Sequence, residues 1–202
     1  FRKAYPHIKI HLDEGSSLDM IHSLLDLKNQ VAIVAQAEDH PDVCFIPFSQ
    51  EKLVFILSPD HHKAQRTSIS IGDLAGEPII MKEMGSGTRR LVNELFAQNS
   101  MLPNVLMETS NTEFIKQLVQ RRDGVSFVVR EAVAAELQMG TLTTVPIEGH
   151  KMLLDVSIAY LRNQHLSPPA KAFLDVLGTL APTDMSPQGV GALMAKMLAR
   201  RI

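Results

Sequence analysis

The stretch from Pro78 to Val129, PIIMKEMGSGTRRLVNELFAQNSMLPNVLMETSNTEFIKQLVQRRDGVSFVV, alternates short apolar runs with amphipathic ones. The apolar runs have the length and composition of buried strands, and the amphipathic runs repeat apolar residues at helical spacing. We therefore expect three strands alternating with two helices, in the order Pro78–Met81, Thr88–Gln98, Val105–Glu108, Thr112–Arg121 and Val125–Val129. Such an order is typical of an open α/β sheet.

The rest of the chain follows the same alternation. Apolar and polar residues alternate over Ile8–Leu12, which predicts a half-buried strand. Helical spacing over Leu18–Leu25 predicts a helix capped by Ser16 or Ser17, and residues 60–77 are expected to link two series of elements. The remaining elements expected are strands over Val31–Val34, Val43–Ile46, Leu53–Leu57 and Leu153–Tyr160, helices over Glu131–Met139 and Pro168–Leu177, and an extended stretch over Leu142–Ile147. Two α/β lobes are the fold class that this pattern favours.

Composition narrows the function classes. With 202 residues, of which 45% are hydrophobic and 21% charged, the chain can bury a sizeable core in one or two compact units. A formal charge of −2 gives no general affinity for nucleic acid. The single cysteine, Cys44, lies in an apolar run and is expected to be a buried, inert thiol. No run approaches a membrane span of about 20 apolar residues, and the first residues lack a signal-peptide core, so we expect a cytoplasmic protein.

Two polar stretches each open an amphipathic run. They are Gly85–Arg90 and Ser110–Glu113, and both have the composition of helix N-termini. The leading N–H groups of a helix lack internal partners and carry partial positive charge, so two such starts suggest a site for a small anion. Ordinary capping is the alternative, since Ser110 with Glu113 fits a capping box and Ser86 is an acceptable N-cap.

No other constellation predicts chemistry. His61 and His62 follow Pro59 and Asp60, and we expect a solvated loop there rather than a metal site. The glycines of Gly85–Thr88 are not followed by the Gly-Lys-Ser/Thr of a phosphate-binding loop. We expect no catalytic residue, no cofactor and no metal.

The chain contains a series of short motifs in a fixed order. They are Phe1-(x)3-Tyr-Pro-His-Ile-Lys-Ile, Glu14-Gly-Ser-Ser, Val31-Ala-Ile-Val, Pro47-Phe, Leu53-Val-Phe-Ile-Leu-Ser-Pro-Asp-His, Asp73-Leu, Glu77-Pro-Ile-Ile, Gly85-Ser-Gly-Thr-Arg and Gly124-Val-Ser. This series resembles the effector-binding domain of LysR-type transcriptional regulators over about residues 1–180. The Gly-Ser-Gly-Thr-Arg motif resembles the branch of that family that senses small metabolic anions.

The resemblance implies two Rossmann-like lobes of the type II periplasmic-binding-protein kind, connected by two crossover strands, with the effector in the cleft between them. We expect the crossings near Glu77 and near Gly149–Met152. Lobe I then comprises residues 1–77 and 152–180, and lobe II comprises residues 78–151. Residues 181–202 extend past the family's usual end, and their apolar residues at helical spacing suggest either a docking helix or a disordered tail.

The resemblance also implies which residues contact the effector. Hydroxyls and free N–H groups at helix starts can satisfy an anion without burying an opposite full charge. Arg89 would add charge-assisted hydrogen bonds, although an arginine in a first helical turn is more often solvated. The implied contacts are Ser86, Gly87, Thr88 and Arg89 on one helix of lobe II, Asn111 and Thr112 on the next, and Ala35, Gln36 and Val129 at strand ends.

In this family the domain forms antiparallel homodimers or homotetramers, and promoter DNA is bound by a preceding winged helix-turn-helix. Nothing in this sequence resembles that DNA-binding domain, and the first strand and the start of the first helix of the effector domain are also expected to be missing. A periplasmic-type solute-binding protein for a small anion is the first alternative function. An enzyme on the same fold is the second, and it needs a general acid or base in the cleft.

Overall fold

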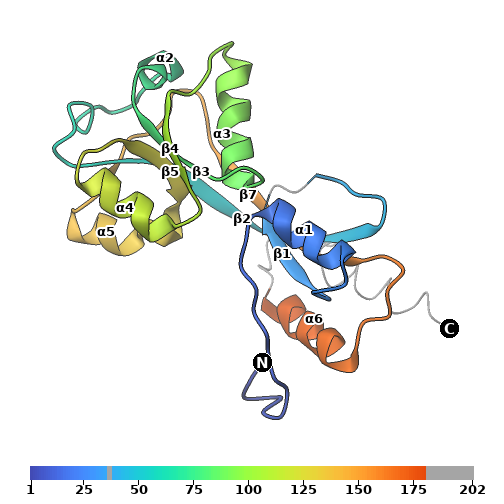
Figure 1. The fold of residues 1–202 in the computed structure, drawn as a ribbon. Coiled ribbons are helices and arrows are strands. Elements are labelled where there is room, and N and C mark those ends of the chain that lie inside the picture. The colour runs from blue at the N-terminus through green and yellow to red at the C-terminus, as the bar shows by residue number, and fades with distance from the viewer. Residues whose placement is uncertain (36–37, 181–202) are drawn as a thin grey trace. The chain divides into compact units, whose positions relative to one another are not determined.

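The computed structural model describes residues 1–35 and 38–180 (Figure 1). The described residues divide into two units, the first formed by those of Phe1–Ser49 together with those that follow Leu154, and the second by Gln50–Leu154. The chain passes from one unit to the other twice, within strand β2 (Val43–Leu57) and within strand β7 (Leu153–Leu161). The predicted α/β fold with two crossover strands is therefore confirmed.

The first boundary differs from the predicted one. It lies at Ser49–Gln50 rather than near Glu77. The reason is packing, because the apolar residues between these two positions belong to the core of the second unit and not to that of the first. They include Leu53, Phe55, Leu57, Ile69, Ile71 and Leu74, which share one cluster with Ile79 and Phe96.

The second unit contains the predicted alternation. In chain order its elements are α2 (Ile71–Ala75), β3 (Ile79–Lys82), α3 (Gly87–Gln98), β4 (Val105–Thr109), α4 (Thr112–Gln120), β5 (Val125–Val129), the 3-10 helix η1 (Arg130–Val133), α5 (Ala134–Met139) and β6 (Thr143–Thr144). Strand β3 pairs in parallel with both β4 and β5, and β5 pairs antiparallel with β2. Helices α2 and α3 pack on one face of this sheet, and α4 and α5 pack on the other (Figure 1).

One glycine has a packing role at this sheet. A Cβ on Gly124, just before β5, would lie 2.6 Å from the carbonyl oxygen of Pro78, just before β3. Only glycine permits the two backbones to approach this closely at the start of the two strands.

The first unit is built from α1 (Ser17–Leu25), β1 (Ala32–Ala35), the first part of β2, the last part of β7, and α6 (Pro168–Leu180). Strand β1 pairs antiparallel with β7. Helix α1 buries Ile21 and Leu24 in one core, and α6 buries Leu174 and Leu177 in another. Cys44 packs against the second of these cores, and it is half-buried rather than fully buried.

Several predicted elements differ from the structure. Residues 8–12 form no strand, and Ile10 and Leu12 are 50% and 80% exposed, because no strand among the described residues pairs with them. The two strands predicted at Val43–Ile46 and Leu53–Leu57 are one continuous strand, β2. Helix α2 lies in the predicted link, and the helix predicted from Glu131 begins as the 3-10 turn η1. The extension at 181–202 lies outside the described residues. None of the described helices combines the length and the apolar character that crossing a membrane needs.

Candidate functional site

The candidate site of the second unit lies at the carboxyl ends of its parallel strands. Helix α3 follows β3, and α4 follows β4, which is the neighbour of β3 in the sheet. The ends of these two strands are in register, with Lys82 opposite Thr109, and the Lys82 ammonium donates a hydrogen bond to the carbonyl oxygen of Ser110. The sequence therefore brings two helix N-termini to one edge of one sheet, which is where open α/β folds bind their ligands.

Helix α3 begins without a side-chain cap. Ser86 occupies the N-cap position in an extended conformation and is buried, but its hydroxyl accepts no hydrogen bond from the helix backbone. The first N–H to bond within the helix is that of Arg90, which donates to the Ser86 carbonyl oxygen. The N–H groups of Gly87, Thr88 and Arg89 therefore have no internal acceptor, and they carry the positive end of the helix dipole.

Helix α4 begins with a cap, but not the predicted one. The N-cap is Asn111, whose side-chain oxygen accepts from the Phe114 N–H at 3.0 Å. The capping box predicted for Ser110 and Glu113 is wrong, because the helix starts one residue later than that box requires. Glu113 instead forms an ion pair with Lys116 at 2.6 Å. Within the described part of the chain, the Thr112 hydroxyl has no hydrogen-bond partner.

Arg89 is not solvated. Its guanidinium lies 2.7 Å from the carboxylate of Glu108 on β4 and donates to the Lys82 carbonyl oxygen at 3.2 Å, and its side chain is 13% exposed. The Nε of Arg89 is buried without a hydrogen-bond partner among the described residues. Glu83 in turn lies 3.5 Å from the Lys82 ammonium. The negative charges of Glu83 and Glu108 thus balance the positive charges of Lys82 and Arg89 beside the start of α3.

The strand-end candidates fall in both units. Val129 ends β5, which is parallel to β3, so it lies at the same edge of the sheet as the starts of α3 and α4. Ala35 ends β1 in the first unit, and its backbone is already bonded: Ser17 Oγ donates to the Ala35 carbonyl oxygen at 2.9 Å and accepts from its N–H at 3.0 Å. Gln36 lies outside the described residues.

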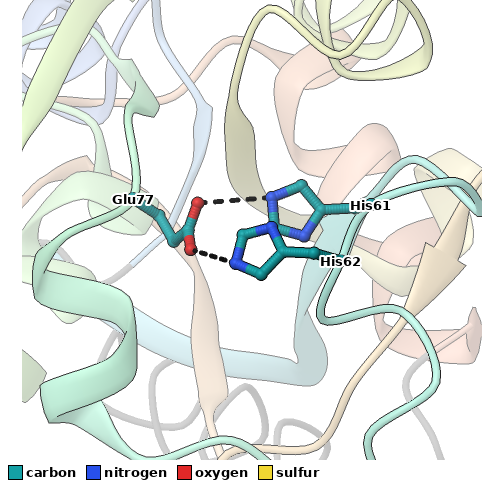
Figure 2. A group of neighbouring side chains, drawn as sticks. All are labelled: His61, His62 and Glu77. Atoms are coloured by element: carbon teal, nitrogen blue, oxygen red, sulfur yellow. Dashed lines mark hydrogen bonds and ion pairs between the residues drawn. The ribbon is translucent and has the colours of Figure 1, made fainter.

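A cluster that the sequence did not predict forms around Glu77 (Figure 2). His61 Nε2 lies 3.2 Å from Glu77 Oε2, and His62 Nε2 lies 3.2 Å from Glu77 Oε1. Lys63 Nζ lies 2.5 Å from the same Oε1. The expected solvated loop is therefore wrong for His61, whose side chain is 14% exposed, whereas that of His62 is 67% exposed. No local spacing reveals this cluster, because Glu77 is brought in by the chain that follows α2.

Burial and the neighbouring charges shift the pKa values of His61 and Glu77 in opposite directions. Burial lowers the pKa of His61 and outweighs the attraction of the Glu77 carboxylate. Burial raises the pKa of Glu77, but the hydrogen bond and the charge of Lys63, with the two imidazoles, leave it below its ordinary value. Near neutral pH, Glu77 is therefore ionised and His61 is neutral.

The sequence is similar to those of transcriptional regulators. It is 34% identical over 177 residues to the HTH-type transcriptional activator CmpR of Synechocystis sp. (strain ATCC 27184 / PCC 6803 / Kazusa), a match that covers 88% of this chain and 58% of CmpR. It is 29% identical over 175 residues to the HTH-type transcriptional regulator YeiE of Escherichia coli K12, covering 87% of this chain and 59% of YeiE. The chain thus spans less than two thirds of the length of these relatives.

Two solved structures are also similar. The regulatory domain of Synechocystis PCC6803 CcmR in complex with 2-PG matches with a TM-score of 0.82 and 28% identity, over 91% of this chain and 88% of that one. The effector-binding domain of QuiR in complex with shikimate matches with a TM-score of 0.77 and 26% identity, over 87% of this chain and 84% of that one. Since the family model of the LysR substrate binding domain matches residues 1–181, the chain belongs to that family.

Proposed function

We propose that this chain is the effector-sensing part of a LysR-type, DNA-binding transcriptional regulator, and that it binds a small anionic metabolite at the start of α3. The observation that carries the proposal is the uncapped N-terminus of α3, with Arg89 in its first turn. We define the proposed anion site as Ser86, Gly87, Thr88 and Arg89, with Asn111 and Thr112 from the start of α4.

The chemistry of these groups suits a carboxylate or a phosphate. Three N–H groups without internal acceptors face the same end of α3, and the helix dipole favours negative charge there. The hydroxyls of Ser86 and Thr88 have no hydrogen-bond partner among the described residues, so they are free to donate to an anion. When no ligand is bound, Glu108 balances the charge of Arg89, which avoids the cost of an unpaired buried cation.

The solved relatives support this choice of ligand class. One was solved with 2-phosphoglycolate and the other with shikimate, both of them small anions. 2-Phosphoglycolate and shikimate are therefore suitable probes of the proposed anion site. Val129 is a further candidate at the same sheet edge. Ala35 and Gln36 stay predictions from the resemblance.

For the whole protein, we propose promoter binding through a domain outside this sequence, assembly as a homodimer or homotetramer, and a cytoplasmic location. The relatives that match are named as HTH-type regulators, which favours this proposal over a periplasmic solute-binding protein. Effector binding would act by favouring one of two conformations of the assembled regulator. Light scattering of the purified chain, with and without the anion, measures the assembly.

The test is a calorimetric titration of the chain and of Thr88→Val with 2-phosphoglycolate and shikimate. The substitution keeps the shape and removes one hydroxyl donor, so we expect an affinity loss of about 1 to 3 kcal/mol for the anion that binds. Thr67→Val, in an exposed loop of the same unit, is the matched control and should bind like the wild type. Equal affinity of Thr88→Val and the wild type would show that Thr88 makes no contact with the anion.

A further inference from the structure

The cluster around Glu77 points to a second site of different chemistry. We propose that His61, His62 and Glu77 bind a divalent transition-metal ion of the Zn²⁺ type. The cluster is distinct from the proposed anion site, because Glu77 precedes the amino end of β3 whereas α3 begins beyond its carboxyl end. Its residues come from two parts of the chain: His61 and His62 lie in the loop after β2, and Glu77 lies just before β3.

The donor atoms lie close enough together to be brought around one ion. One ligand atom from each of the three residues lies within 4.8 Å of the other two. The Nε2 atoms of His61 and His62 are each 3.2 Å from a different oxygen of Glu77, and two ligand atoms bound at about 2.0–2.1 Å in a tetrahedral zinc site lie about 3.3 Å apart. Figure 2 shows both rings directed at the same carboxylate. Binding of one ion requires side-chain rotations that bring the two Nε2 atoms and the carboxylate of Glu77 around it.

The orientation of His61 is fixed by its own loop. Its Nδ1 accepts a hydrogen bond from the Lys63 N–H at 3.2 Å, which directs Nε2 toward Glu77. Since Nδ1 accepts in this arrangement, the ring proton is on Nε2. A metal at Nε2 requires that proton to move to Nδ1, which can then no longer accept from the Lys63 N–H. Metal binding therefore breaks this hydrogen bond, and the ring must turn away from the Lys63 N–H.

Lys63 is the competitor of the metal ion. Its ammonium lies 2.5 Å from Glu77 Oε1 and supplies the positive charge that the carboxylate needs when no metal is bound. The Lys63 ammonium also donates a hydrogen bond to the Asp73 carbonyl oxygen at 2.6 Å. This second acceptor would remain when the Glu77 carboxylate coordinates a metal ion. Metal binding therefore exchanges one counter-charge for another and does not leave the Lys63 ammonium buried without an acceptor.

The ligand types select the metal. Two imidazoles and one carboxylate suit Zn²⁺, Ni²⁺ or Cu²⁺, whereas Mg²⁺ and Ca²⁺ prefer sites made only of oxygen. His62 is the exposed member of the set and leaves one side of the cluster open to solvent. Three protein ligands with an open side leave a fourth coordination position to water, as in other three-ligand zinc sites.

The experiment is a calorimetric titration of the full chain with Zn²⁺ at neutral pH, repeated with His62→Ala. The His62 side chain is 67% exposed, and its polar and ring partners among the described residues are Glu77 and His61, so the variant should fold like the wild type. We expect one Zn²⁺ per chain for the wild type and at least a tenfold lower affinity for His62→Ala. His150→Ala, an exposed histidine of the same unit, is the control and should bind like the wild type.

A second readout is the melting temperature, which a ligand of the folded state raises by mass action. Zn²⁺ should raise it for the wild type and for His150→Ala, and much less for His62→Ala. Wild-type affinity in His62→Ala, an equal loss in His150→Ala, or no saturable Zn²⁺ binding by the wild type would each overturn the proposal. None of these outcomes bears on the anion site, which the titrations with 2-phosphoglycolate and shikimate test separately.

Discussion

Helices α1 and α3 both begin after a serine, and they use it in opposite ways. In α1 the Ser16 hydroxyl accepts from the Asp19 N–H, and the Asp19 carboxylate accepts from the Ser16 N–H, both at 3.1 Å. This closed capping box recurs in α2 with Ser70 and Asp73. In α3 the N-cap is Ser86, no side-chain cap forms, and the N–H groups stay open.

The residue at the third helical position explains the difference. It is aspartate in α1 and α2, where a carboxylate complements the positive end of the helix and completes the box. In α3 it is Arg89, which has no acceptor atom and whose charge opposes the helix dipole. Arg89 turns instead to Glu108 and the Lys82 carbonyl oxygen. The starts of α1 and α2 are thus closed by side-chain caps. The start of α3 keeps backbone N–H donors without an internal acceptor and an arginine whose charge Glu108 balances, and both features suit a site for an anion.

The largest effect is expected when α3 is made to resemble α1. Arg89→Asp supplies the missing carboxylate, which can close a capping box with Ser86, and it removes the cation. We expect the affinity for the anion to fall about 100-fold, or about 2.7 kcal/mol, because a charge-assisted donor is replaced by a like charge. Calorimetry with the anion that binds the wild type measures the change.

The control for that variant is Arg121→Asp, which makes the same charge change at an exposed position beyond the end of α4. It should bind with less than a threefold change. Equal weakening in both variants would mean that net charge, and not the start of α3, determines anion binding.

A smaller effect is expected on stability, where substitutions of the N-cap serines of α1 and α3 should differ. Ser16→Ala removes a cap hydrogen bond and should lower the free energy of unfolding by about 1 kcal/mol. Ser86→Ala removes a hydroxyl that caps nothing, and we expect a loss of less than about 0.5 kcal/mol. Urea denaturation of the two variants measures both values. If Ser86→Ala were the more destabilising of the two, the hydroxyl of Ser86 would have a structural partner after all.

The smallest effect concerns pH. The hydroxyl and backbone N–H of Ser70 hold the pKa of Asp73 below its ordinary value. A carboxyl group with a lowered pKa in the folded state contributes stability that is present above the unfolded pKa and is lost as the pH falls through the folded one. Stability should therefore decline below about pH 4 more steeply in the wild type than in Asp73→Asn.

Denaturation at several pH values tests that difference, with Asp175→Asn on α6 as the control for the loss of an exposed carboxylate. The control should follow the wild type. Identical pH profiles for Asp73→Asn and the wild type would show that the box of α2 contributes no pH-dependent stability.

Much of the fold follows from period and composition. The alternation over residues 78–129 predicts β3, α3, β4, α4 and β5 with bounds within a residue or two, because each element buries an apolar face of regular spacing. Residues 8–12 have an equally regular pattern and form no strand, since a strand also needs a neighbour to pair with. The periodicity of apolar residues indicates that one face of a segment can be buried, but it does not indicate whether a neighbouring strand is present to pair with it.

The candidate site was only partly predictable. Gly85–Arg90 and Ser110–Glu113 both indicate helix starts. The exact N-cap position was not predictable, because a shift of one residue changes it, and in α4 the N-cap is Asn111 rather than Ser110. The partner of Arg89 comes from a different strand, and Glu77 meets His61 only through tertiary packing. Contacts between segments far apart in the sequence leave no local pattern.

The proposed anion site at the start of α3 is tested most directly by a titration of ¹⁵N-labelled protein with 2-phosphoglycolate and shikimate, followed by the backbone amide signals. The anion that binds should move the signals of Gly87, Thr88 and Arg89 most strongly, since their N–H groups become its donors. The signals of Ser17–Asp19 at the closed start of α1 should move little. Saturable binding that leaves the signals of Gly87–Arg89 unchanged would show that the anion does not bind at the start of α3.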